Sequence, residues 1–359
     1  GCGAPRNLVE RFFGRGGSSL PDRPASSSGL PYFLNGYTTE DGTPMATANC
    51  LSCHASYLRG SLVMGLGETR VDFTDDVSSL MAMASLVSVP GQAGKDLRRL
   101  IERVQAIGPY IRMQVVGSNA AGAIALALFA HRDAKTLAWS DKLLIQEPHK
   151  EVTPIDVPAW WLLKKKNAMF FSGGGRGDHA RIMRTASALC TDSVESARKI
   201  DAYFPSIRSY ILSLEPPAWP YDLDEKRAEA GEQIFTKRCQ RCHGSYGKAE
   251  TYPNLLVSLE EVGTDPSLAT ESDQYAAPYR TWFAESFYGE HSRLEPSGGY
   301  VAPPLDGVWA TAPYFHNGSV PTVAGVLNSQ DRPGRWKDLR TRDRYLEGQL
   351  GFPYALSLI

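Results

Sequence analysis

Two pentapeptides with one shared pattern constrain this chain more than any other feature. They are Cys50–His54 (CLSCH) and Cys239–His243 (CQRCH). Cys-x-x-Cys-His is the attachment pattern of a c-type haem, in which two thiols bond to one macrocycle and the histidine reaches the iron. A thioredoxin-like pair or half of a zinc site also contains Cys-x-x-Cys, but the histidine in both copies and their wide separation favour haem. The predicted attachment and ligand residues are Cys50, Cys53 and His54 for a first haem and Cys239, Cys242 and His243 for a second.

The length of the chain indicates more than one domain. Its 359 residues exceed the usual size of a single core. Pro216-Pro217 ends the helical pattern of the first half, and a new amphipathic pattern then runs directly into the second motif. We therefore predict a mainly α fold with long loops and two tandem cytochrome c-like haem domains. Residues 1–36 are predicted to be an N-terminal tail or tether, 37–218 the first domain and 219–359 the second.

Composition and the remaining cysteines bear on location. The formal net charge of −1 suggests neither nucleic acid nor an anionic membrane surface as the main partner. Covalent haem attachment takes place outside the cytoplasm, where thiols oxidise, so we expect the periplasm or the surface of a bacterium. Cys2 and Cys190 could form a disulfide there. Alternatively, Gly1-Cys2-Gly3 looks like the end of a bacterial lipoprotein signal, in which case a lipid on Cys2 would tether the chain to a membrane.

Two loops repeat at an offset of 145 residues, and each follows a haem motif. A few identities alone would be a weak repeat, but their common order after the two motifs strengthens it. The matched pairs are Val157-Pro158 with Ala302-Pro303, Phe170 with Phe315, and Gly173 with Gly318.

The same offset aligns Phe171 with His316. A histidine can ligate iron and a phenylalanine cannot. We therefore predict that His243 and His316 hold the second haem in a six-coordinate state suited to electron transfer. The first haem would keep an open or weakly held position, where O₂ or H₂O₂ could bind.

The segment Trp309–Thr322 (WATAPYFHNGSVPT) resembles the bacterial dihaem cytochrome c peroxidase superfamily, which includes MauG-type enzymes. It most resembles the rubber-oxygenase, RoxA-like branch, and the resemblance extends over residues 37–330. It implies a reactive N-terminal haem and a C-terminal haem that relays electrons. It also implies that His316 ligates the second haem and that Phe171 lies over the oxygen-binding face of the first.

Two departures from the family pattern matter. Peroxidases of this superfamily use a methionine as distal ligand of the C-terminal haem, but the last methionine here is Met183, which favours a bis-histidine second haem. The chain is also much shorter than a rubber oxygenase, so the polymer-binding additions are expected to be missing.

Several other residues have both a functional and a structural interpretation. Trp160 and Trp161 either fill the core or include a bridge for electrons between the haems, as tryptophans do in relatives. His179 is a candidate acid, base or ligand at the first haem, or a solvated loop residue. Lys164–Lys166 could bind haem propionates, face a redox partner or be solvated. Relatives hold Ca²⁺ between their domains, although no spaced carboxylate loop supports that ion here.

The predicted function is that of a dihaem c-type cytochrome oxidoreductase, either a peroxidase or an oxygenase. It would activate H₂O₂ or O₂ at the N-terminal haem and relay electrons through the C-terminal one, with a small electron-donor protein or an organic substrate as partner. The alternative is a non-catalytic electron-transfer cytochrome, in which Met64, Met169 or His179 closes the first haem.

Overall fold

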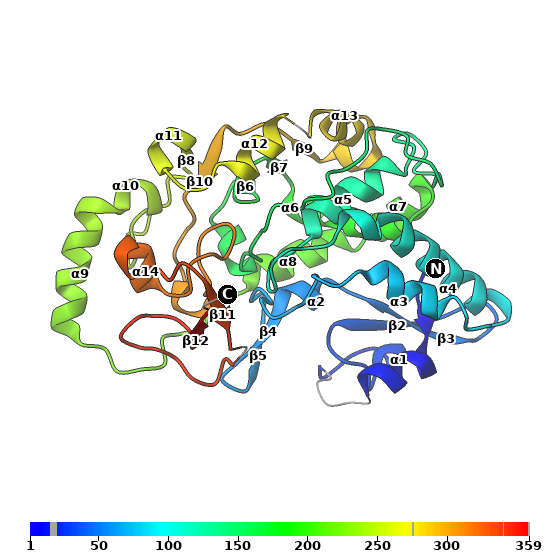
Figure 1. The fold of residues 1–359 in the computed structure, drawn as a ribbon, viewed down its shortest axis with the longest axis horizontal. Helices are drawn as coiled ribbons and strands as arrows, with labels where there is room; N and C mark the ends of the chain where they lie inside the picture. The colour runs from blue at the N-terminus through cyan, green and yellow to red at the C-terminus, as the bar shows by residue number, and fades with distance from the viewer. Residues whose placement is uncertain (15–19, 275, 340, 358–359) are drawn as a thin grey trace.

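The computed structural model describes residues 1–14, 20–274, 276–339 and 341–357 (Figure 1). It is 39% helical, with 14% strand in small sheets. The α-helices are α1 (Arg6–Phe13), α2 (Leu51–His54), α3 (Val77–Ala84), α4 (Gly91–Ile107), α5 (Ala121–Ala130), α6 (His179–Met183), α7 (Val194–Asp201), α8 (Phe204–Ser213), α9 (Glu225–Arg238), α10 (Gln240–His243), α11 (Leu259–Val262), α12 (Ser267–Gln274), α13 (Ala277–Glu285) and α14 (Val323–Leu327).

The strands form short antiparallel sheets at separate places in the molecule. Two sheets have three strands, in the orders β1-β3-β2 and β6-β7-β9, and the pairs β4-β5, β8-β10 and β11-β12 form the others. The strands are β1 (Ala4–Pro5), β2 (Leu34–Thr38), β3 (Pro44–Ala48), β4 (Ala55–Leu58), β5 (Ser61–Met64), β6 (Ala168–Met169), β7 (Gly175–Gly177), β8 (Leu256–Ser258), β9 (Ser292–Leu294), β10 (Gly299–Val301), β11 (Trp336–Asp338) and β12 (Tyr354–Leu356).

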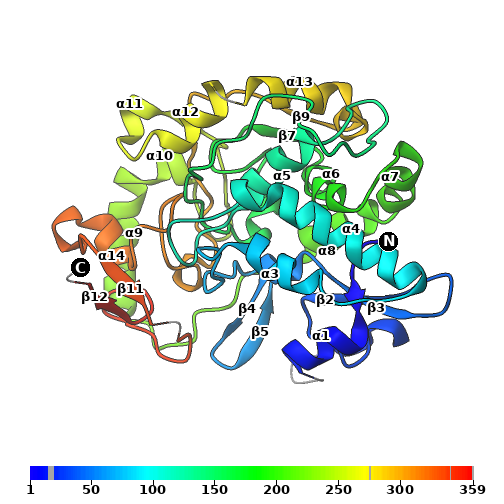
Figure 2. The same cartoon turned by 45° about the vertical axis from the view of Figure 1, so that its right-hand side comes forward.

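The two largest hydrophobic cores each combine residues from both halves of the chain. One joins buried residues between Ile107 and Ala197 with those of Tyr279–Tyr288. The other joins residues between Leu58 and Trp161 with those of Trp309–Phe352. Figure 2 shows α13, from the second half, above α5, from the first. The prediction of a mainly α fold with two tandem cytochrome c-like domains is therefore wrong.

Specific contacts explain why the halves do not fold as tandem units. Strand β9 adds to β7 of the first half, with Gly175 opposite Leu294. The Trp282 ring stacks on Phe129 at 4.3 Å between centroids, and its Nε1 donates to the carbonyl of Arg132 at 2.6 Å. Buried aromatic rings and ladder hydrogen bonds each require their partner, so these contacts join the two halves in shared cores.

The N-terminal segment, predicted to be a tether, is folded over its described residues. Strand β1 pairs with β3 in an antiparallel register, and α1 covers this sheet. A small core of Val9, Leu30, Leu34 and Ala46 holds the segment together. The segment has few apolar residues between its Ser, Gly and Pro runs, but those of α1 and of the β1-β3-β2 sheet pack against each other.

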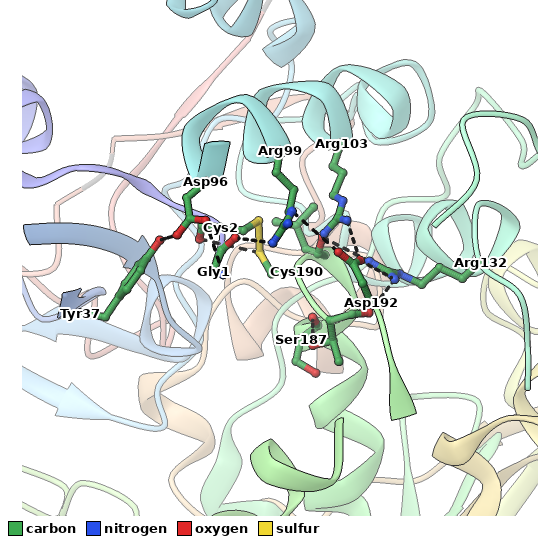
Figure 3. The surroundings of a disulfide bond; sticks show 12 residues. Gly1, Cys2, Tyr37, Asp96, Arg99, Arg103, Arg132, Ser187, Cys190 and Asp192 are labelled. Carbon is green, nitrogen blue, oxygen red and sulfur yellow. Dashed lines mark hydrogen bonds and ion pairs between the residues drawn. A yellow bond between two sulfur atoms is a disulfide. The ribbon is translucent and has the colours of Figure 1, made fainter. Parts of the chain in front are cut away.

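A disulfide joins this N-terminal segment to the rest of the molecule. Cys2 and Cys190 are bonded, with their Cα atoms 5.5 Å apart (Figure 3). Beside it, the Tyr37 hydroxyl donates to Asp96 at 2.9 Å, and Asp192 is paired with several arginines. A thioether-linked lipid on Cys2 would require the same sulfur atom, so the structure favours the disulfide of the two sequence alternatives.

Replacing Cys2 and Cys190 together with serine should lower the free energy of unfolding by about 2–5 kcal/mol, because the bond closes a loop that spans 188 positions. Urea denaturation of the oxidised protein measures the change. Each single serine variant should lose as much as the double variant, since both remove the same bond. Wild-type stability in the double variant would contradict this prediction.

Within the described part of the chain, none of the helices combines the length and the apolar character needed to cross a bilayer.

Candidate haem sites

A surface helix leads directly into the second motif. Helix α9 begins at its N-cap Asp224, whose side chain accepts from the backbone N–H of Arg227 at 3.1 Å. Glu225 in its first turn and two basic residues in its last turn suit the helix dipole. Cys239 follows at once, and α10 carries Cys242 and His243. The helix buries none of its side chains, and Ile234 is 60% exposed.

Hydrogen bonds connect the loop 301–306 with the second motif and with the residues that follow it, including one from the Leu305 N–H to the Tyr246 hydroxyl at 2.6 Å. Nδ1 of His243 lies 2.8 Å from the carbonyl oxygen of Pro303. Tyr246 donates to the His243 carbonyl at 3.1 Å, and Tyr252 donates to the Ala302 carbonyl at 2.6 Å. With Nδ1 bonded to a carbonyl, the nitrogen of His243 left for a metal is Nε2.

The first motif leads into a hairpin instead. Helix α2 ends at His54, and β4 and β5 follow. The backbone N–H of Gly65, after the hairpin, donates to the His54 carbonyl at 2.8 Å, and the N–H of Trp160 donates to the Gly65 carbonyl at 2.8 Å. The Trp160 ring then stacks on the His54 ring, with 4.6 Å between centroids. These contacts fix the orientation of the imidazole.

Surrounding protein shifts the pKa of every titratable group in the first motif. Burial lowers the pKa of His54 to about 4, opposed by the nearby carbonyl of Pro158. Burial also raises the pKa of the Cys50 and Cys53 thiols, although Cys50 keeps exposed surface. His54 is therefore a neutral imidazole at physiological pH, the form that can bind iron.

The two repeated loops pair with each other reciprocally. The N–H of Asp156 donates to the carbonyl of His316 at 2.8 Å, and the N–H of Val301 donates to the carbonyl of Phe171 at 2.8 Å. Val301 lies 145 positions after Asp156, and His316 lies 145 positions after Phe171. A third pair at this offset, Trp161 and Asp306, is itself joined by a hydrogen bond. Equivalent atoms in the two loops thus exchange equivalent bonds.

The loops also share an unusual turn. Phe170 and Phe315 both have positive φ angles, of 68° and 67°, which non-glycine residues seldom adopt. In each loop, the glycine three positions later donates to that phenylalanine's carbonyl at 3.2 Å. Gly173 and Gly318 have φ angles of 69° and 65°, where a side chain would be disfavoured. The repeat predicted from sequence is therefore present in the backbone of these loops.

This pairing brings Phe171 and His316 into one neighbourhood, with 6.4 Å between ring centroids. His316 is buried and stacks on Tyr300 at 4.4 Å. Its Nε2 lies 3.5 Å from the Tyr300 hydroxyl, and burial lowers its pKa, opposed by Asp265. Binding of iron through Nε2 would replace this long contact. The role of His316 as a ligand stays a prediction.

The two tryptophans occupy different positions. Trp160 lies against His54, and its Nε1 is buried without a hydrogen-bond partner among the residues that the structure describes. Trp161 is fully buried in the core shared by both halves, and its Nε1 donates to the Asp306 carbonyl at 2.9 Å. Trp161 therefore fills the core, and its contact with Asp306 also places it between the loops that follow the two motifs. Its proposed role as a bridge for electrons stays a prediction.

His179 lies apart from the other candidates. It opens α6, whose N-cap Asp178 accepts from the N–H of Ala180, and it is buried rather than solvated. Burial lowers its pKa, as does Arg208, against the attraction of Asp178. Among the described contacts, none joins the His179 ring to His54 or Phe171. Its catalytic role stays a prediction.

Met64 and Met169, the other candidate sixth ligands, are half-buried in strands β5 and β6. Among the described residues, no group of three or more His, Cys, Asp or Glu side chains could hold a metal ion by itself.

The residues at both motifs fit a c-type haem. Each supplies two free thiols beside an imidazole, which is the donor set that this cofactor requires. His54 is neutral, and His243 is oriented by Pro303. The carbonyls of Pro158 and Pro303 beside these two histidines were not predicted from the sequence. Their signal was present, because Pro158 and Pro303 are equivalent in the repeat.

One comparison identifies the segment that carries His316. Residues 299–337 match the RoxA-like, cytochrome c-like family model. The RoxA-like segment begins with β10 and contains both Pro303 and His316. It supports a relationship to RoxA-like cytochromes and a haem-based redox function. It also covers a single short part of the chain, which further contradicts the prediction of two tandem cytochrome c-like domains.

Two curated proteins of Sinorhizobium fredii are similar to this chain. The uncharacterized protein y4iM is 26% identical over 234 residues, which cover 57% of this chain and 51% of that protein. The uncharacterized protein y4iJ is 27% identical over 206 residues, which cover 41% of this chain and 35% of that protein. The matched part of this chain thus spans about half of the length of y4iM and about a third of the length of y4iJ.

Proposed function

We propose that this protein is a c-type cytochrome oxidoreductase with two covalent haems, one at Cys50–His54 and one at Cys239–His243. The first would react with H₂O₂ or O₂. The second, ligated by His243 and His316, would relay electrons from a small donor protein or an organic substrate. When bound, the haem supplies the redox chemistry, and the protein orients and encloses it. The disulfide agrees with a location outside the cytoplasm.

The reciprocal pairing of the two loops carries this proposal. It gives equivalent positions to Phe171, which cannot bind iron, and His316, which can. The same asymmetry appears around the motifs. The Trp160 ring stacks on the His54 imidazole, whereas the helix leading to Cys239 lies on the surface and buries none of its side chains. A motif reached through a surface helix suits electron entry from a partner.

Optical and electron paramagnetic resonance spectra of the ferric protein test the proposal. We expect two haems per chain, one high-spin and shifted by cyanide or H₂O₂, the other low-spin and unaffected. His316→Ala should turn the second haem high-spin, because it removes the proposed ligand, while His179→Ala should leave both unchanged.

Two low-spin haems that ignore cyanide and H₂O₂ would overturn the catalytic proposal and favour the non-catalytic electron-transfer cytochrome. A second haem that stays low-spin in His316→Ala would show that another residue ligates it.

A further inference from the structure

Three consecutive lysines follow Trp160 and Trp161, and the structure separates them by their partners. Lys164 pairs with Glu215, Nζ to Oε2 at 2.6 Å. Lys165 pairs with Asp306 at 2.7 Å and with Glu250 at 2.9 Å. Lys166 forms no ion pair with any described carboxylate. Its Nζ makes one long hydrogen bond, 3.4 Å, to the carbonyl of Phe170.

Lys166 nevertheless has much of its side chain out of contact with water. It is half-buried by accessible surface, and desolvation lowers the pKa of its amine to about 8. An ammonium group removed from water is costly unless an anion accompanies it. The described residues provide no such anion, so the side chain has the desolvation without the compensating charge.

The position of Lys166 relates it to the first motif. It follows the turn that carries Trp160, whose ring stacks on His54, and its hydrogen bond among the described residues goes to Phe170, the residue before Phe171. Lys165, in contrast, extends toward the second motif, where its Nζ lies 5.1 Å from the Tyr246 ring centroid.

We propose that Lys166 is the counter-ion of a propionate carboxylate of the haem attached at Cys50–His54. The proposal rests on the haem attachment proposed above, but not on any reaction with peroxide or oxygen. A propionate would supply the anion that the protein lacks at this point, and the ammonium group would in turn hold the haem edge in place. Lys166 would then be a positioning residue.

The first test measures the pKa of Lys166 in the full-length, haem-loaded protein. Lysines are reductively methylated with ¹³C, and the Lys166 resonance is identified by its absence in Lys166→Arg. A propionate partner should raise the pKa to the ordinary value of about 10.4 or above. A measured pKa near 8 would overturn the proposal, because it would show an amine still without an anion.

The second test compares midpoint potentials. Lys166→Met should lower the potential of the first haem, because the loss of a nearby positive charge favours the ferric state. Lys166→Arg should keep the wild-type potential, and Lys164→Met, which removes a lysine already paired with Glu215, should not change it. No change, or a change confined to the haem at Cys239–His243, would overturn the proposal. Failure of the cyanide response alone would affect the proposed function and leave this inference standing.

Discussion

Replacing Cys50 and Cys53 together with alanine is expected to reduce covalently bound haem from two per chain to one and to lower activity toward H₂O₂ or O₂ at least about tenfold. Without the thioether bonds, His54 alone must hold the macrocycle. A pyridine haemochrome assay on the denatured protein measures covalent haem, and peroxide consumption measures activity.

The matched control replaces Cys239 and Cys242 with alanine. This variant should also hold one haem, but that haem should keep its high-spin signal and its shift with cyanide, while multiple turnovers slow because the relay is lost. Equal cyanide responses in the two variants would contradict the assigned division of roles. Two haems remaining in either variant would contradict the attachment sites themselves.

Trp161→Ala should lower the free energy of unfolding by about 3–5 kcal/mol. The side chain is fully buried in the core that both halves share, and its removal leaves a cavity there. It also leaves the Asp306 carbonyl without its donor. Urea denaturation of the haem-loaded protein, followed by far-ultraviolet circular dichroism, measures the loss.

Two further variants separate the contributions at this position. Trp161→Phe keeps most of the ring but removes the indole N–H, so it should cost about 1 kcal/mol from the hydrogen bond beside a smaller packing loss. Leu327→Ala, on a side chain that is 78% exposed, should change stability by less than about 0.5 kcal/mol. Wild-type stability of Trp161→Ala would show that this core does not unite the two halves.

The haem motifs and the loop repeat could be read from the sequence because both are local patterns. Attachment requires two thiols and a histidine at fixed spacing, which no tertiary contact has to supply. The turn at Phe170 and Phe315 likewise depends on residues within one loop, including its glycine, so the same short sequence gives the same φ angles twice. The roles of Phe171 and His316 were inferred from the same offset and remain predictions.

The domain organisation could not be read in this way. The sequence places a proline pair at 216–217 and a fresh helix after it, and this pattern favours two successive units. Whether β9 adds to β7, or whether Trp282 stacks on Phe129, depends on contacts between segments more than a hundred residues apart. Helical and alternating patterns show which face is apolar, but not which segment will cover it.

By itself, the sequence determined the two candidate attachment sites and the repeated loops. For Cys2 it left two alternatives, a disulfide with Cys190 or a bound lipid. Only the tertiary structure decided that Cys2 pairs with Cys190, that the N-terminal segment is folded, and that the halves share their cores. It also separated Lys166 from its two neighbours, which have the same side chain. The physical reason is that attachment chemistry depends on spacing along the chain, whereas burial and charge pairing depend on which distant groups meet.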